Sequence, residues 1–141
     1  MIERRIEINA PIETVYQVVS DLEAYPEFLS TTDEVEVSRE NGQLEAVFSV
    51  NVVKKVSYTL VFTEEAPKRL SWRLKEASFM KKNNGEWELE SIDENKTQAK
   101  YKIDVEFGWM VPKKLVGMLT ETQLPELLRA FTQRAERVAK E

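Results

Sequence analysis

The chain has neither cysteine nor histidine among its 141 residues. Without cysteine there are no disulfides, no thiolate nucleophiles and no cysteine-ligated metal sites. Without histidine, histidine-based catalytic triads and imidazole acid–base pairs are excluded as well. No apolar run reaches the roughly eighteen residues that a membrane-spanning helix requires, and the start of the chain, Met1 to Arg5, lacks the apolar segment of a signal peptide. We therefore expect a cytoplasmic protein with no metal site and no cofactor.

The composition predicts a single globular domain over residues 1–141. Hydrophobic residues make up 42% of the chain and charged residues 32%, as in ordinary globular domains. A chain of this length buries a substantial core without disulfides, and no repeat, low-complexity segment or linker divides it. The formal net charge of −5 argues against nucleic-acid binding, because contacts with phosphates require a basic surface.

The last thirty or so residues, from Met110 to Glu141, carry the longest helical pattern. Their apolar residues recur at three- and four-residue steps, which is the period of one apolar helix face. Pro112 suits the first turn, where its missing N–H would have no partner. Gly117 costs up to about 1 kcal/mol relative to alanine in a helix, and Pro125 removes a backbone hydrogen bond and should bend the helix. We expect tight packing to be interrupted in the middle of this helix.

The rest of the chain reads mainly as strands. Residues 2–9 alternate between apolar and polar side chains, which predicts a strand with one buried face. Two short helical segments follow, over about residues 11–19 and 22–29. From Glu34 to Phe107 apolar and polar residues alternate again, in about six segments separated by turns. The predicted turns are at Asn41-Gly42, Lys54-Lys55, Ala66-Pro67-Lys68, Asn83-Asn84-Gly85 and Asp93-Glu94-Asn95-Lys96. Strands with one apolar face predict an antiparallel sheet covered on one side, and the C-terminal helix is the element long enough to cover it.

Several local sequences resemble those of one known family. They are Asn9-Ala10-Pro11 with residues 15–21, Tyr25-Pro26-Glu27-Phe28-Leu29, Gly85-Glu86-Trp87-Glu88-Leu89, Thr97 with Tyr101, Trp109-Met110-Val111-Pro112, Leu124-Pro125-Glu126-Leu127-Leu128 and Arg134-Ala135-Glu136. These sequences are similar to the polyketide cyclase/dehydrase and coenzyme Q-binding branch of the START-like superfamily. The resemblance covers essentially the whole chain.

This resemblance implies an α+β helix-grip fold, in which a curved antiparallel sheet of about seven strands wraps around the long C-terminal helix, with two short helices after the first strand. It also implies an apolar tunnel between sheet and helix that holds a lipid, an isoprenoid, a polyketide or a similar molecule. Where the coenzyme Q-binding branch usually has a proline and an aromatic–cysteine pair, this chain has Ser30-Thr31-Thr32-Asp33. That departure weakens the expectation of a quinone ligand.

The candidate ligand-binding residues are those that we expect on the inner face of the sheet, on the short connecting helix and on the C-terminal helix. Buried tyrosine and tryptophan need partners for their O–H and N–H groups, so such residues are natural anchors for a ligand carbonyl or hydroxyl. Glu76 is the acid that strand alternation places inward, where burial would raise its pKa; a solvated strand end is the alternative. For each aromatic residue the alternative is plain core packing. The candidate residues are Tyr25, Phe28, Phe48, Tyr58, Leu60, Trp72, Leu74, Glu76, Trp87, Tyr101, Ile103, Gly117, Thr120 and Leu124.

Three functions stay open, and no catalytic residue is assigned. The leading hypothesis is a non-enzymatic carrier of a small hydrophobic molecule, because an aromatic inner face lies beneath an amphipathic helix without an evident catalytic group. The second is an aromatase/cyclase-type enzyme of polyketide metabolism, whose chemistry can proceed by shape, water and a few tyrosine, arginine or carboxylate groups. The third is a toxin-like module that binds ribosomes or proteins.

The lysine pairs Lys54-Lys55, Lys81-Lys82 and Lys113-Lys114 are interpreted as solvated turns. Transient contact with an anionic membrane surface is the alternative, since each basic residue contributes about 1 kcal/mol there. The sequence leaves the oligomeric state open.

Overall fold

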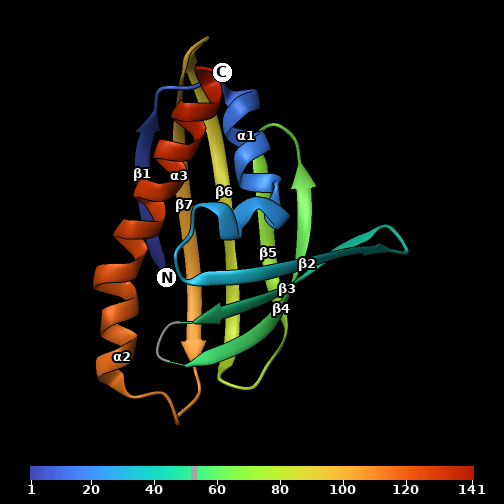
Figure 1. The fold of residues 1–141 in the computed structure, drawn as a ribbon, viewed down its shortest axis with the longest axis vertical. Coiled ribbons are helices and arrows are strands. Elements are labelled where there is room, and N and C mark those ends of the chain that lie inside the picture. Colours follow the sequence, from blue (N-terminus) through green and yellow to red (C-terminus); the bar gives the residue numbers. More distant parts are fainter. Residues whose placement is uncertain (52–53) are drawn as a thin grey trace.

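The computed structural model describes residues 1–51 and 54–141. They form a seven-stranded antiparallel sheet with helices on one of its faces (Figure 1). In chain order the elements are β1 (Ile2–Ile8), α1 (Ile12–Ser20), the 3-10 helix η1 (Leu22–Glu27), β2 (Thr32–Glu40), β3 (Gln43–Asn51), β4 (Lys55–Glu65), β5 (Arg69–Ala77), β6 (Met80–Asp93), β7 (Lys96–Phe107), α2 (Lys113–Met118), the π-helical turn η2 (Leu119–Gln123) and α3 (Leu124–Ala139). The predicted element order and the α+β class are confirmed. Across the described ranges, no helix has both the length and the apolar character needed to cross a membrane.

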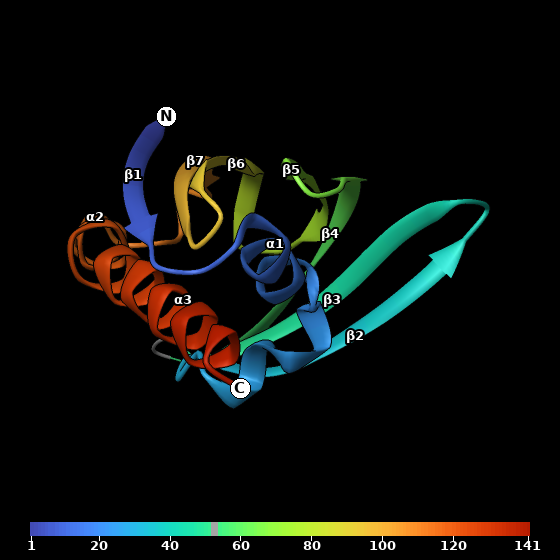
Figure 2. The ribbon, with the colours of Figure 1, turned by 90° about the horizontal axis from the view of Figure 1, so that it is seen from above.

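The sheet is a series of hairpins with the N-terminal strand added at one edge. Its order is β1-β7-β6-β5-β4-β3-β2, and β1 pairs with β7 along its whole length. Seen from above, the sheet curves around α1 and α3 (Figure 2). Asn41 and Gly42 form the predicted two-residue turn, with positive φ angles of 55° and 74° that suit a type I′ turn. The sequence also places Val52 on the apolar face of β3, but this residue lies outside the described ranges.

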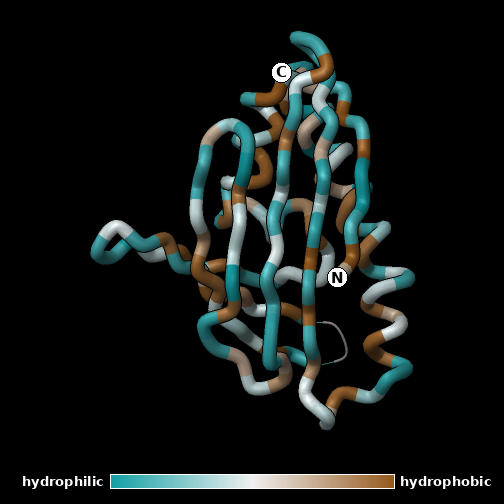
Figure 3. Tube along the Cα trace, turned by 180° about the vertical axis from the view of Figure 1, so that it is seen from behind, coloured by the Kyte–Doolittle hydropathy of each residue, from teal (hydrophilic) through white to brown (hydrophobic). Residues whose placement is uncertain are grey.

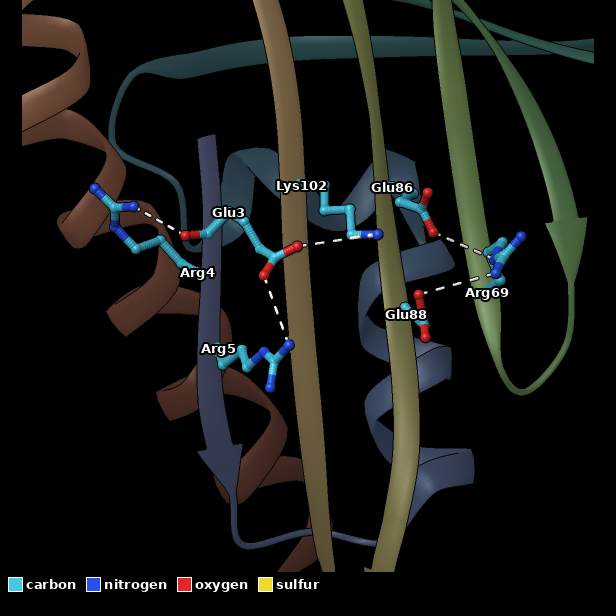
Figure 4. A network of polar contacts seen from close by, with 7 residues as sticks. All are labelled: Glu3, Arg4, Arg5, Arg69, Glu86, Glu88 and Lys102. Carbon is cyan, nitrogen blue, oxygen red and sulfur yellow. Dashed lines mark hydrogen bonds and ion pairs between the residues drawn. The ribbon is translucent and has the colours of Figure 1, made fainter. Parts of the chain in front are cut away.

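The face of the sheet that points away from the helices carries charged side chains (Figure 4). Arg69 on β5 contacts Glu86 at 3.3 Å and Glu88 at 3.9 Å on β6, while Glu3 and Lys102 approach to 4.0 Å across β1 and β7. Hydrophilic residues recur along the strands when the sheet is seen from this side (Figure 3). Such exposed pairs contribute at most about 1 kcal/mol each, but they keep this face hydrated. An apolar ligand is therefore expected on the opposite face.

One predicted turn is wrong. Residues 83–85 lie inside β6, and the chain turns at residues 78–79 instead. Packing, not a turn, requires Gly85, because a β-carbon there would lie only 2.4 Å from Cζ2 of Trp72. The Trp72 indole lies across this glycine and donates its N–H to Oδ1 of Asn83 at 3.1 Å.

The C-terminal helix packs tightly only in its second half. Phe131 on α3 is 2% exposed, and its ring centre lies 5.1 Å from that of Trp87, 5.2 Å from that of Tyr25 and 5.1 Å from that of Phe28. The other buried residues of α3 are Leu124, Leu128 and Ala135. In contrast, α2 and η2 bury no residue. The helix is therefore anchored to the sheet at its C-terminal end and leaves space beneath its N-terminal end.

A π-helical turn separates the two halves of this helix. The backbone N–H of Leu124 donates to the carbonyl of Leu119, five residues earlier. Pro125 follows directly, and it has no N–H for the carbonyl of Glu121. The hydrogen bond that the proline removes is thus lost beside the π-helical turn. Turns of this kind are frequent at functional sites.

Replacing Gly85 with alanine should lower the free energy of unfolding by about 1–3 kcal/mol, because the added methyl group displaces the Trp72 indole. Gly117→Ala is the matched control. Nothing lies within 4 Å of the added carbon at Gly117, so this change should stabilise the helix by up to about 1 kcal/mol. Urea unfolding followed by circular dichroism measures both values. Equal unfolding free energies for the two variants would contradict the packing described around Gly85.

Candidate ligand-binding cavity

A cavity of about 660 Å³ lies between the sheet and the part of the C-terminal helix made up of α2, η2 and the start of α3. Its helix side is formed by Leu115, Val116, Leu119, Thr120, Gln123, Leu124, Leu127 and Ala130. Its sheet side is formed by Val50, Val56, Tyr58, Met80, Asn83, Tyr101, Ile103, Val105 and Phe107. Most of these side chains are apolar, and cavities of this size and lining are typical of small-molecule sites.

Two tyrosine hydroxyls place polar groups within the apolar lining. Tyr58 stacks on Phe48 with ring centres 5.3 Å apart, and the ring of Tyr101 lies 4.8 Å from that of Trp87. Burial raises the pKa of Tyr58 to about 12. Burial also raises the pKa of Tyr101, with a smaller contribution from the neighbouring Tyr58. Both hydroxyls stay protonated at neutral pH and have no hydrogen bond to another described residue, so they can donate to a ligand oxygen.

Asn83 adds a third donor on the sheet side of the cavity. Its side chain is buried, and its Oδ1 accepts the hydrogen bond from the Trp72 indole. Its Nδ2 lies 3.8 Å from the sulfur of Met80, which is a weak acceptor. A side-chain amide has two N–H donors, so Asn83 retains donor capacity toward the cavity. Because Oδ1 accepts the hydrogen bond from Trp72, the Nδ2 end of the amide is the one that can donate to a ligand.

Four charged side chains also line the cavity: Lys54, Asp104, Glu126 and Arg129. The hydrogen bond from Lys82, at 2.7 Å, holds the pKa of Asp104 below its usual value. Arg129 contacts Glu126 at 3.2 Å. Both lining carboxylates are therefore already paired with a cation, and neither is placed as a free proton acceptor.

The structure brings part of the predicted residue set to this cavity. The predicted residues that line it are Phe28, Tyr58, Tyr101, Ile103, Thr120 and Leu124. Those that pack in or against the core instead are Tyr25, Phe48, Leu60, Trp72, Leu74 and Trp87. The Tyr25 hydroxyl is already used, because it donates to the carbonyl of Val19. Gly117 lies on α2 with open space around it, so a close approach of the sheet does not explain this glycine.

Glu76 does not point inward as strand alternation predicts. Leu74 pairs with Leu60, but the next pair joins Glu76 to Thr59, so Lys75 is an extra residue on β5. A bulge of this kind moves every later side chain to the other face of the sheet. Glu76 is therefore exposed on the outer face, away from the cavity.

Sequence reasoning missed several lining residues. Asn83 could have been found by counting back in steps of two from Trp87, which places it on the inner face of one continuous strand. The helix residues Leu115, Leu119 and Leu127 were visible as part of an apolar stripe, but a stripe does not distinguish a solid core from a cavity. Lining residues from the connections, such as residues 30–31 and Phe79, belong to no periodic pattern.

The chain belongs to the family described as polyketide cyclase/dehydrase and lipid transport, whose model matches residues 8–132. The resemblance seen in the sequence is thereby confirmed, and the fold is the START-like helix-grip fold of a ligand-binding family. Comparison with curated protein sequences gives no match.

Solved structures show the same fold. A START superfamily protein from Mycobacterium smegmatis is 22% identical, with 97% of each chain covered and a TM-score of 0.84. The Zhui aromatase/cyclase from a Streptomyces species is 20% identical, over 96% of this chain and 93% of that one, also with a TM-score of 0.84. A protein from Thermus thermophilus is 21% identical over 98% of both chains, again at 0.84.

The free energy of unfolding should fall as the pH rises above about 10. Tyr25, Tyr58 and Tyr101 ionise in the unfolded chain near the usual tyrosine pKa of about 10, whereas burial raises the pKa of each in the folded protein. Each such group contributes up to about 1.4 kcal/mol per pH unit in this range. In Tyr58→Phe one of these groups is absent, so stability should fall less steeply with pH. Urea unfolding in a series of buffers from about pH 8 to pH 11 tests this; identical slopes would contradict the burial of Tyr58.

Proposed function

We propose that this protein, as a single domain over residues 1–141, binds and carries a small hydrophobic molecule in the cavity between the sheet and the C-terminal helix. One observation carries the proposal: the cavity of about 660 Å³ is lined mostly by apolar side chains and lies beside α2 and η2, the part of the helix in which no residue is fully buried. Membership of a family described by cyclase chemistry and lipid transport supports the same conclusion.

The donors in the cavity define the kind of ligand. Tyr58, Tyr101 and Asn83 all offer hydrogen-bond donors on the sheet side, while the helix side is dominated by Leu119, Leu127 and their apolar neighbours. A ligand with an apolar body and a carbonyl or hydroxyl oxygen would satisfy both sides. Leaving such buried donors unpaired costs free energy, so the site selects against a pure hydrocarbon.

An aromatase/cyclase activity is the second candidate. Tyr58 and Tyr101 are neutral donors that could polarise a ligand carbonyl, as ring closure by aldol chemistry requires. The same chemistry needs a group that accepts a proton, and the two lining carboxylates, Asp104 and Glu126, are paired with Lys82 and Arg129. The arrangement therefore supports binding more directly than turnover.

Native mass spectrometry of the gently purified protein should show a bound small molecule that organic extraction releases. The extracted protein should then take up N-phenylnaphthylamine, whose fluorescence rises in apolar surroundings. Thr120→Trp should reduce this uptake at least about tenfold, because the indole fills the cavity. Thr132→Trp is the control, since Thr132 lies on α3 outside the cavity and makes the same side-chain bond to the preceding helical turn. A protein that is purified without any bound small molecule and takes up no N-phenylnaphthylamine would contradict the carrier hypothesis.

Loss of one tyrosine hydroxyl should weaken the binding of an oxygen-bearing ligand. We expect Tyr58→Phe and Tyr101→Phe each to reduce the affinity for dodecanone about three- to tenfold, as the loss of one neutral hydrogen bond predicts. Affinity for dodecane should stay the same or rise, because dodecane accepts no hydrogen bond and the variant no longer leaves that hydroxyl unpaired. Displacement of N-phenylnaphthylamine measures both affinities. Tyr25→Phe is the matched control, since its hydroxyl bonds to Val19 instead of facing the cavity; an equal effect in that variant would contradict the assigned anchors.

A further inference from the structure

The loop between β7 and α2 exposes two large apolar side chains to solvent. Trp109 is 88% exposed and Met110 is 67% exposed. The loop is held in place by its backbone: the N–H of Gly108 donates to the carbonyl of Phe79 at 2.9 Å, and the N–H of Val111 donates to the carbonyl of Gly108 at 3.0 Å. Its exposed side chains are therefore presented by an ordered turn. Two adjacent, strongly exposed large apolar side chains form a candidate interaction surface, which needs further support.

Three lysines lie near this loop, and one exposed acid, Glu106, precedes it on β7. Lys113 and Lys114 follow it in the first turn of α2, and Lys81 lies at the start of β6, next to the turn at residues 78–79. No ion pair joins any of these three lysines to another residue in the described ranges, and all three are exposed. The first turn of α2 holds no acidic residue, although the helix dipole disfavours positive charge there. Local positive charge on a chain of net charge −5 favours an anionic partner at this end.

The loop also borders the cavity. Phe79, Phe107 and Val111 line the cavity, and the rings of Phe79 and Phe107 stack with centres 6.5 Å apart. Trp109 and Met110 come directly between Phe107 and Val111 in the chain but point to solvent. In Figure 1 this loop lies at the lower end of the molecule, far from the C-terminus. A surface that covered the loop would thus face the apolar end of the cavity.

We propose that residues 108–114 form a docking surface for an anionic lipid bilayer. Trp109 and Met110 enter the headgroup region, where tryptophan is favoured because its ring is apolar and its N–H is polar. Lys81, Lys113 and Lys114 contact the lipid phosphates. Docking brings the Phe79–Phe107 end of the cavity against the membrane, which is where an apolar ligand would be collected or released. Only this last role rests on the carrier function; the docking surface stands on the exposed loop and its lysines.

Cosedimentation with vesicles tests the proposal with the full chain. The protein should bind vesicles of mixed phosphatidylcholine and phosphatidylglycerol at least about tenfold more tightly than vesicles of phosphatidylcholine alone, since each lysine near the surface contributes about fivefold. Tryptophan emission should shift to the blue on binding, because Trp109 is exposed whereas Trp87 is buried. Trp109→Phe should keep most of the binding and lose the shift.

Matched variants distinguish binding through the loop from nonspecific adsorption to vesicles. Trp109→Ser with Met110→Ser should reduce vesicle binding about tenfold or more, whereas Ile92→Ser removes an exposed apolar residue from the opposite end and should have no effect. Lys113→Glu with Lys114→Glu should abolish the preference for anionic vesicles. Lys68→Glu with Lys140→Glu makes the same charge change at exposed positions away from the loop and should preserve it.

Several results would overturn the docking surface: equal binding to both vesicle types, no binding to either, or equal losses in the loop variants and their controls. A dimer in solution that disappears in Trp109→Ser would show that a second copy covers the loop instead. Probe uptake is measured without vesicles, so the two proposals fail separately. Probe uptake without vesicle binding would contradict docking alone, and vesicle binding without probe uptake would contradict the carrier function alone.

Discussion

The packing of the C-terminal helix against the inner face of the sheet depends on the burial of the Phe131 ring. Its ring contacts aromatic rings from β6 and from the segment around η1, namely Trp87, Tyr25 and Phe28. Burying one such side chain contributes roughly 1.5–3 kcal/mol, and each favourable aromatic pair adds about 0.5–1.5 kcal/mol. One turn further along α3, Arg134 lies 5.1 Å from the ring centre of Phe28 and pairs with Glu27. This cluster holds sheet, η1 and helix together at one end of the molecule.

The cavity follows from that one-sided anchoring. The C-terminal helix is fully buried against the curved sheet only at positions on α3, and no residue of α2 or η2 is fully buried. The π-helical turn before Pro125 lies at the boundary between the packed and the unpacked half. The space that remains is lined by apolar groups and by the donors of Tyr58, Tyr101 and Asn83. The same feature therefore explains the tight packing of one half of the protein and the cavity beside the other.

Periodicity in the sequence was enough to predict the strands, the long helix and the α+β class, because each strand has one buried face. It failed at two places. A bulge at Lys75 shifts the register, so that Glu76 points outward. Residues 83–85 resemble a turn in sequence but lie in a strand, where Gly85 packs under the indole of Trp72. The site was predicted only in part, since a buried aromatic residue has the same pattern in a core as in a cavity wall. Whether Tyr25 or Tyr58 faces the cavity depends on where the helix leaves the sheet, which is a tertiary property.

The most direct test of the account is to locate a bound apolar molecule by nuclear magnetic resonance. Intermolecular nuclear Overhauser effects between N-phenylnaphthylamine and assigned methyl groups report which side chains it touches. We expect contacts to the methyl groups of Ile103, Leu119 and Leu127, which line the cavity, and none to Leu70 or Val15, which are fully buried in the packed half. Contacts confined to the outer face of the sheet, or none to the helix residues, would contradict the claim that this protein binds its ligand beneath the unpacked half of the helix.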